Sequence, residues 1–257
     1  MEEKIETSLE SVRRLFVRKQ RLEGRLPEKP SKEDLLSVVR DLCYVQWDPI
    51  DAVAPSHILS FWSRVGSFRL SDLDALLWED RKLFMHWNPA SLVPTELYPL
   101  CHSLMRRYPE SVSDSWGSWK HGARKFLAAH GGLQKRVLAE LGKRGPLSAN
   151  EFQDHVPGRS SDGWTAGSDV SQMLFHLLML GQVMVVGHRG NQNLWDLSDK
   201  FLPGWVDKEE LSQEEFEHEA AQKALRSLGT ATPREVFLYF PRARYLLLKK
   251  TIARLKN

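Results

Sequence analysis

An amide and a carboxylate lie two residues apart in the segment YVQWDP, residues 44–49. In an extended backbone alternate side chains point the same way, so Gln46 and Asp48 would share one side of the segment. A carboxylate can oppose positive charge that develops on a substrate and take a proton from water, and an amide can hold that water. The alternative is a helix-to-strand junction, in which Asp48 caps a turn and Gln46 is solvated.

Aromatic and basic side chains offer contacts for a nucleic acid. Stacking walls could come from Trp47, Trp62 and Trp87, although core packing explains each equally well. His57 could donate to a phosphate or flank a cleft, and a packed or capping histidine is an equal alternative. Candidate phosphate contacts, for which a solvated surface is the alternative, are Arg13, Arg14, Arg18, Arg106, Arg107, His188 and Arg189.

Motifs of other enzyme classes are missing. The sequence has no G-x-x-x-x-G-K-[ST], G-x-G-x-x-G or G-x-S-x-G pattern. His218-Glu219 lacks the second histidine of H-E-x-x-H, so it is not a zinc-binding helix motif. Neither cysteine, Cys43 or Cys101, has a CxxC partner. We therefore expect neither a metal nor a nucleotide cofactor.

The composition is that of a globular protein. The 257 residues are 42% hydrophobic and 27% charged, with a net charge of +3 and two cysteines, too few for a disulfide framework. The N-terminus is charged and no apolar run approaches the roughly 20 residues that span a bilayer. We expect a cytoplasmic protein, and the membrane, collagen-like and secreted disulfide-rich classes are excluded.

Hydrophobic spacing predicts three units, each beginning with an amphipathic helix. The first, 1–130, carries helices at 9–19 and 56–65 (the latter with Leu59, Trp62 and Val65 on one face), a helix capped by Ser31, a short helix capped at 71–74, and a hairpin over 82–93 that turns near Asn88-Pro89.

The second unit, 131–206, has the order of a winged helix. It shows a helix, a capping box over 148–151, a helix over 168–180 ended by Gly181, and strands 183–186 and 194–197 joined by 188–192. The expected outward face of its last helix has no basic residue, which argues against a sequence-reading transcription factor. That face would consist of Ser168, Gln172, Phe175, His176 and Met179.

The third unit, 207–257, begins with an acidic stretch over 207–219, read as a solvated helix face. A helix over 220–228, a helix capped by Thr232 and a last helix from about 243 follow, with no wing strands after them. The predicted fold is mainly α with small β-hairpins (α+β), in tandem winged-helix units of which the third is incomplete.

Several stretches match one family in chain order. They are VQWDPI (45–50), HILSFWSR (57–64), Phe84 with Trp87 and ASLVP (90–94), Trp164 with SDV (168–170), LGQVMV (180–185), Asp196-Leu197 with Leu202-Pro203, and LGTAT (228–232). These resemble the AlkZ/YcaQ-like winged-helix DNA glycosylases, bacterial enzymes that remove alkylated bases and unhook interstrand crosslinks. Their signature is Q-x-Q or Q-x-D, followed by a helix with a W-x-R-like element.

The resemblance implies catalytic roles for Gln46 and Asp48 and a site role for Arg64, on double-stranded DNA in the bacterial nucleoid, without a cofactor. No lysine lies between Lys32 and Lys82, so we expect a monofunctional glycosylase that leaves an abasic site. The family's hairpin histidine is missing, and His86 or Asn88 would replace it. A non-catalytic winged-helix DNA-binding or assembly protein is the alternative. The oligomeric state stays open.

Overall fold

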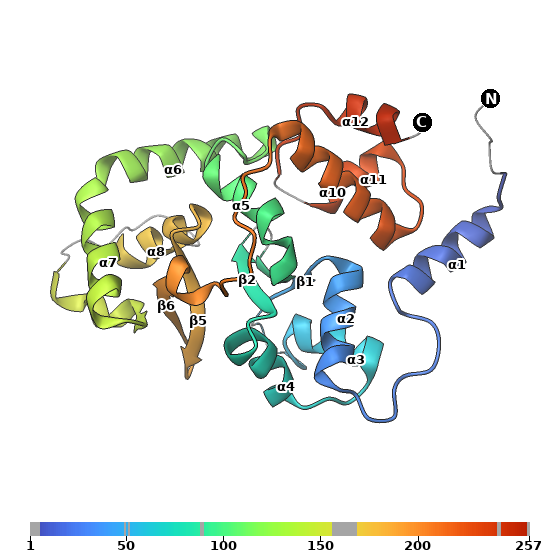
Figure 1. Ribbon diagram of the computed structural model, residues 1–257, viewed down its shortest axis with the longest axis horizontal. Helices are drawn as coiled ribbons and strands as arrows, with labels where there is room; N and C mark the ends of the chain where they lie inside the picture. Colours follow the sequence, from blue (N-terminus) through green and yellow to red (C-terminus); the bar gives the residue numbers. More distant parts are fainter. Residues whose placement is uncertain are drawn as a thin grey trace.

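The computed structural model describes residues 6–48, 50, 52–87, 90–155, 169–240 and 243–255. Helices dominate them, and the strands form two small antiparallel sheets of order β1-β3-β2 and β4-β6-β5 (Figure 1). The predicted mainly α fold with small β-hairpins is therefore confirmed. The predicted hairpin turn at Asn88-Pro89, Trp164 and Ser168 lie outside the described residues.

The first core lies under helices α2 (Lys32–Leu42), α3 (Ser56–Val65) and α4 (Leu70–Asp74), the last continued by a π-helical turn over Ala75–Glu79. The predicted capping box at Ser31 is present, because its hydroxyl accepts from the Asp34 amide and Asp34 accepts in return. The predicted cap at 71–74 is wrong. Helix α4 begins after Arg69, whose guanidinium pairs with Asp72 instead.

The apolar face predicted for α3 is only partly buried. Its Leu59 and Trp62 are exposed, whereas Val65 is buried together with His57 and Phe61. The helix turns Phe61 and His57 inward because Phe61 packs in the first core and His57 stacks on the ring of Trp47, the residue that follows β1.

The first sheet joins β1 (Val45–Gln46) to the hairpin β2 (Leu83–Trp87) and β3 (Ala90–Pro94). Gln46 lies opposite Ser91, which lies opposite His86, so these three residues share one face of the sheet. The other face covers the first core through Val45 and Leu92.

A helical segment leads to the second unit through the 3-10 turn Thr95–Leu97, α5 (Tyr98–Arg106), the 3-10 turn Asp114–Trp116, α6 (Gly117–Ala129) and α7 (Gly131–Arg144). Sequence periodicity did not predict α6. This helix buries only one hydrophobic residue, Ala123, so it lacks the apolar stripe on which such a prediction depends.

The second sheet contains β4 (Leu147–Ser148), β5 (Val183–Arg189) and β6 (Gln192–Leu197). Along the chain, a 3-10 segment over Ala149–His155 and helix α8 (Asp169–Met179) lie between β4 and β5. Helix α9 (Ser198–Phe201) follows β6. The predicted loop over 188–192 is wrong, since both strands run into it and leave a tight turn at Gly190, which has φ +59°.

The predicted outward face of α8 is wrong in part. His176 and Met179 are buried, and the Tyr108 hydroxyl lies 2.7 Å from Nδ1 of His176. Phe175 stays half-exposed. Helix α8 is thus held on two sides, by its own unit's core and by Tyr108 of the segment that precedes α6.

The last helices are α10 (Gln213–Leu228), α11 (Pro233–Tyr239) and α12 (Leu248–Leu255), with α1 (Leu9–Lys19) beside α10. The predicted capping box at Thr232 is present. Glu217, however, is fully buried, which contradicts a solvated face at that position. Its carboxylate accepts from the backbone amides of Leu246 and Leu247 and so anchors the chain before α12.

Residues from distant parts of the chain meet in one further core. Phe84 of β2 and Met105 of α5 pack there with Met184 of β5 and Phe201 of α9. The hairpin β2-β3 and the second sheet are therefore neighbours, with β2 beside α8 and β5 (Figure 1). The unit boundaries at 130 and 206 and the winged-helix assignment stay predictions.

Candidate active site

A groove of about 960 Å³ lies where the first hairpin meets the second sheet and α8. We call this cavity the groove. Its lining is mostly apolar or neutral polar: Trp47, Pro55, Met85, His86, Ala90, Ser91, Phe175, Leu178, Val185, His188, Gly190, Asn191, Asn193 and Trp195. The volume is at the upper end of the range for small-molecule sites.

Trp47 is the centre of an aromatic stack at the groove. Its ring lies 3.9 Å from the His57 ring at an interplanar angle of 11°, and 5.7 Å from the His188 ring at 5°. His188 also meets Trp78 edge-on at 5.3 Å. The hairpin β5-β6 thus contacts the segment that carries the predicted catalytic pair.

The predicted catalytic residues flank Trp47 rather than line the groove. Gln46 is exposed on β1, one strand from Ser91, which does line it. Asp48 is half-buried, and its Oδ1 accepts from the Ile50 amide at 3.0 Å. Among the described residues, none donates a hydrogen bond to Oδ2 of Asp48. One oxygen therefore caps a turn, as the alternative expected, while the other stays available.

Backbone bonds fix this segment next to the groove. The Trp47 amide donates to the Ala90 carbonyl at 2.8 Å, and the Ser56 amide donates to the Asp48 carbonyl at 3.3 Å. The second bond ties the segment to the start of α3. His57, the next residue of that helix, thereby comes to lie under the Trp47 ring.

The histidines of the stack are neutral at neutral pH. Burial lowers the pKa of His57 to about 4, and the backbone and charge of Asp48 oppose this only in part. Burial also lowers the pKa of His188, against the opposing hydrogen bond with Asn193 and the charge of Asp74. No lysine or arginine is among the described residues that line the groove. The groove thus suits a planar or apolar group better than a phosphate.

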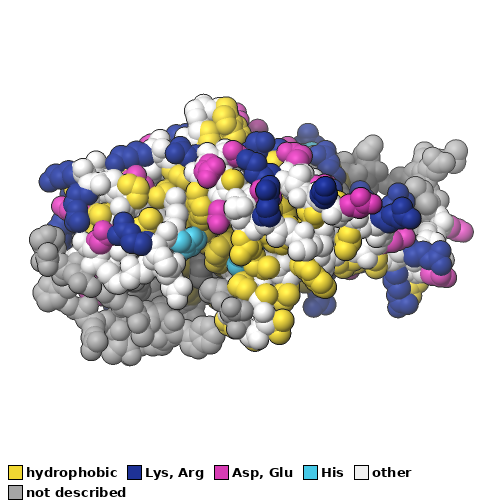
Figure 2. Space-filling model, turned by 90° about the horizontal axis from the view of Figure 1, so that it is seen from below, with side chains coloured by type: hydrophobic (Ala, Val, Ile, Leu, Met, Phe, Trp, Pro, Cys, Tyr) yellow, Lys and Arg dark blue, Asp and Glu magenta, His cyan; other side chains and the backbone are white. Residues whose placement is uncertain are grey.

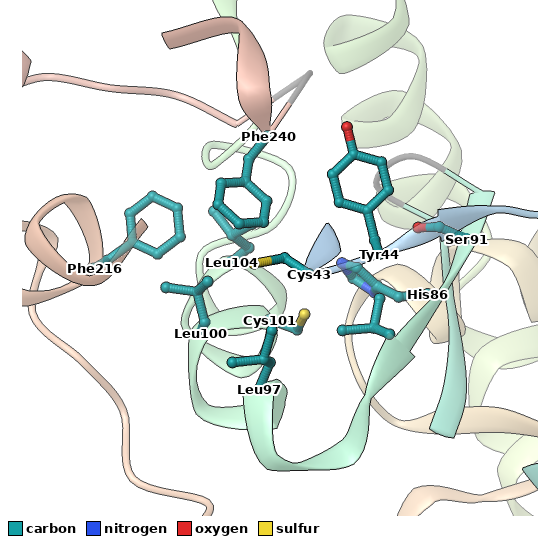
Figure 3. A pocket seen from close by; sticks show the side chains of 11 residues that line it. Cys43, Tyr44, His86, Ser91, Leu97, Leu100, Cys101, Leu104, Phe216 and Phe240 are labelled. Atoms are coloured by element: carbon teal, nitrogen blue, oxygen red, sulfur yellow. The ribbon is translucent and has the colours of Figure 1, made fainter. Parts of the chain in front are cut away.

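His86 lies in the wall between the groove and a smaller cavity on the other side, which we call the inner cavity. Figure 3 shows its ring directed from β2 into the inner cavity, near Cys43 and Cys101. Neither ring nitrogen has a hydrogen-bond partner among the described residues, and burial lowers the pKa of His86 to about 4. His86 therefore faces the interior more than the groove.

The predicted arginines lie away from the groove. Arg64 donates to the carbonyls of Gln20 and Ser60, both at 2.9 Å. Arg106 pairs with Glu210, and Arg107 donates to the Ser103 carbonyl one turn back in α5 and to the Gln213 side chain of α10.

The remaining predicted phosphate contacts lie on α1 or close to the groove. Arg14 pairs with Glu10, and Arg13 is exposed on α1. Arg189 is next to His188 at the end of β5, where it pairs with Glu151 at 3.2 Å. Among the predicted arginines, Arg189 is the one that directly follows a groove-lining residue in the sequence. Asn88 and the side chain of Trp87 lie outside what the structure describes.

Sequence reasoning missed most of the groove lining. Met85, Phe175, Val185 and Trp195 meet there from four elements, and each has the sequence signal of an ordinary core residue. No local pattern could have identified them, because the groove arises only when the two sheets pack side by side.

The described residues offer neither a metal site nor a membrane-spanning helix. They contain no group of three or more His, Cys, Asp or Glu that could hold a metal ion. Their helices include none that is both long and apolar enough to cross a membrane. In Figure 2, hydrophobic and histidine side chains gather near the middle of the visible face, while Lys and Arg are spread over its upper and outer parts.

Comparison with known proteins gives two matches. The structure resembles Streptomyces sahachiroi DNA glycosylase AlkZ, with a TM-score of 0.60 and 18% sequence identity; the match covers 98% of this chain and 66% of that one. At this identity the likeness shows a shared fold, and this chain spans less than two thirds of that protein's length. The sequence model of the DNA glycosylase AlkZ-like family matches residues 39–253, which is most of the chain. The chain therefore belongs to the AlkZ-like DNA glycosylase family.

Proposed function

We propose that this protein is a DNA glycosylase that hydrolyses the N-glycosidic bond of alkylated or interstrand-crosslinked nucleobases. The observation that carries the proposal is the placement of Gln46 and Asp48 on either side of Trp47, at the edge of the groove. Family membership supports a DNA substrate. The fixed Asp48 carboxylate, with Oδ2 lacking a described partner, supports a reaction at that edge.

The reaction needs little acid catalysis. A base alkylated at a purine ring nitrogen carries a positive charge, so when the bond between C1′ and the base breaks, its electron pair neutralises the departing base. The sugar is left as an oxocarbenium-like cation. Asp48 opposes that charge and accepts a proton from the water whose oxygen attacks C1′, while Gln46 holds the water.

The groove favours a stacking mode of base recognition. Trp47 lies in a parallel stack with two neutral histidines, and a nucleobase can extend such a stack because every base has a π-face. The groove is open and large, so an adduct bulkier than a methyl group fits. We propose Trp47, His57 and His86 as parts of the wall that surrounds the base.

DNA backbone contacts are proposed outside the groove. Arg189 on the wing is adjacent to the groove-lining His188, and Arg13 and Arg14 extend the basic surface on α1. Arg106 and Arg107 are bound to acidic or backbone partners, so we assign them the weaker, non-specific part of binding. Trp87 and Asn88, at the hairpin, complete the proposed DNA-binding set.

The proposed enzyme is monofunctional. A lyase reaction would need an amine beside the sugar, and no lysine is among the described residues that line the groove. Sodium borohydride trapping with damaged duplex should therefore give no covalent complex, whereas a trapped complex would assign a lyase.

The test of the proposal is base release. The protein is incubated with duplexes that contain N7-methylguanine or a nitrogen-mustard crosslink, and alkali then cleaves at any abasic site. We expect alkali-labile sites at the lesion and none in undamaged duplex. Intact lesions after long incubation at protein excess would reject the proposal.

The runner-up is a non-catalytic winged-helix DNA-binding or assembly protein. The observation that favours it is that Asp48 caps a turn through Oδ1 and does not itself line the groove. Duplex binding without base release, unchanged by Asp48→Asn, would support this alternative.

A further inference from the structure

A second pocket, rich in arginine, lies at the far end of α3 from the groove. It has a volume of about 220 Å³, and four of its lining side chains are arginines: Arg18, Arg21, Arg25 and Arg64. Two carboxylates, Glu23 and Asp34, also line it, so the formal charge of the lining is +2. We call this site the arginine pocket.

The arginines differ in how far their charge is already neutralised. Arg21 pairs with Asp41, and Asp34 is occupied as the capping partner of Ser31. The guanidinium groups of Arg18 and Arg25 make no hydrogen bond or ion pair to a described residue. These two guanidinium groups are therefore free to bind an anion that enters the pocket.

Arg64 provides a second and independent observation. It is partly buried, its donors Nε and Nη1 are used by backbone carbonyls and the Ser63 hydroxyl, and its Nη2 makes no hydrogen bond to a described residue. Burial lowers the pKa of Arg64, and no carboxylate opposes the shift. A partly buried cation without an acidic partner is what an anion site requires.

A phosphate group fits these features. Guanidinium groups bind phosphate through paired N–H donors, and the pocket has room for the group together with water. The loop over 22–27 leaves the pocket open at Gly24, which has φ +108° and no atom within 4 Å of where a Cβ would lie.

Helix α3 connects the pocket to the groove. His57, under Trp47, and Arg64 are seven residues apart, which is about 10 Å along a helix axis. About three base steps of duplex cover the same length. We infer that the arginine pocket binds a backbone phosphate of the DNA strand about three nucleotides from the base that lies at the groove. This inference rests on the proposed DNA substrate.

The test measures binding to undamaged duplex as a function of salt. The variant is Arg18→Ala with Arg25→Ala, and the control is Lys135→Ala with Arg234→Ala, which removes the same charge from exposed residues without described partners. Loss of one phosphate contact lowers the slope of log K against log salt by about 0.9. When the salt rises from 50 to 200 mM, the factor by which affinity falls should thus be about 3.5 times smaller for the variant than for the wild type. The control should have the salt slope of the wild type.

The position is tested with neutral methylphosphonates placed one at a time along a duplex with a central lesion. In the wild type we expect binding to weaken at a phosphate about three nucleotides from the lesion, and in the variant the same substitution should have no further effect. Additive losses at every position would overturn the inference. So would equal salt slopes for variant and wild type.

Inorganic phosphate distinguishes the two possible sources of the group. If phosphate raises the melting temperature of the wild type but not of the variant, while the salt slopes agree, the pocket binds a free phosphate and the DNA assignment is overturned. None of these measurements requires base release. A protein that changes slope as expected but releases no base would therefore refute the proposed activity and keep the pocket.

Discussion

Replacing His86 with leucine should remove part of the protein's sensitivity to acid. Burial lowers the pKa of His86 to about 4, from a usual value near 6.5. Between these values the unfolded chain binds a proton that the folded protein does not, so stability falls as the pH falls below about 6.5. At about 1.4 kcal/mol per pH unit, the loss from this residue is about 2 kcal/mol at pH 5 and about 3 kcal/mol at pH 4.

Leucine has a similar volume and no nitrogen that needs a partner, so His86→Leu should change stability at pH 7.5 by less than about 1.5 kcal/mol. The assay is urea unfolding at pH 7.5 and pH 5. The wild type loses stability through His86, His57 and His176, whose pKa values burial lowers alike, and the variant should lose about 2 kcal/mol less.

His121→Leu, on the exposed surface of α6, is the matched control and should leave the difference between the two pH values unchanged. If His86→Leu shows the same loss between pH 7.5 and pH 5 as the wild type, then His86 is not a buried neutral group. The assignment of His86 to the wall of the inner cavity would then be refuted.

Two further predictions concern the anchor of the last unit and the aromatic stack. Glu217→Ala leaves the backbone amides of Leu246 and Leu247 without an acceptor, so the free energy of unfolding should fall by about 3 kcal/mol, against less than about 0.5 kcal/mol for the exposed Glu219→Ala; equal urea midpoints would contradict this. Trp47→Ala should weaken binding of damaged duplex by about 5-fold to 150-fold through lost stacking, measured by fluorescence anisotropy. The exposed Trp205→Ala should not, and an equal loss in both variants would show that the effect is not local to the groove.

Features that depend on nearby residues, such as helix caps and the alternation of side chains along a strand, could be predicted from the sequence. The caps at Ser31 and Thr232 form because a hydroxyl and a carboxylate three residues apart satisfy each other's backbone amides. Gln46 alternates with Val45 on β1 as an extended segment requires, with Val45 buried and Gln46 exposed. Such features depend on neighbours within four residues, so no knowledge of the tertiary fold was needed.

Long-range packing was not readable. Helix α3 has apolar residues on two faces, and the fold buries the face of Phe61 because His57 finds a ring to stack on at Trp47. Glu217 looks like one more charge in an acidic run, and only the amides of Leu246 and Leu247 make its burial favourable. The contact between Trp47 and His188, 141 positions later, has no local signal at all.

The central claim is that the Asp48 carboxylate acts on the sugar, and single-turnover base release by Asp48→Asn tests it most directly. Asparagine keeps an oxygen that can accept from the Ile50 amide, so the turn should persist while the charge and the basic oxygen are lost. We predict a rate of N7-methylguanine release about 10² to 10⁴ times lower than in the wild type, with a Kd for the damaged duplex changed by less than about twofold. Release at the wild-type rate by the folded variant would contradict the account.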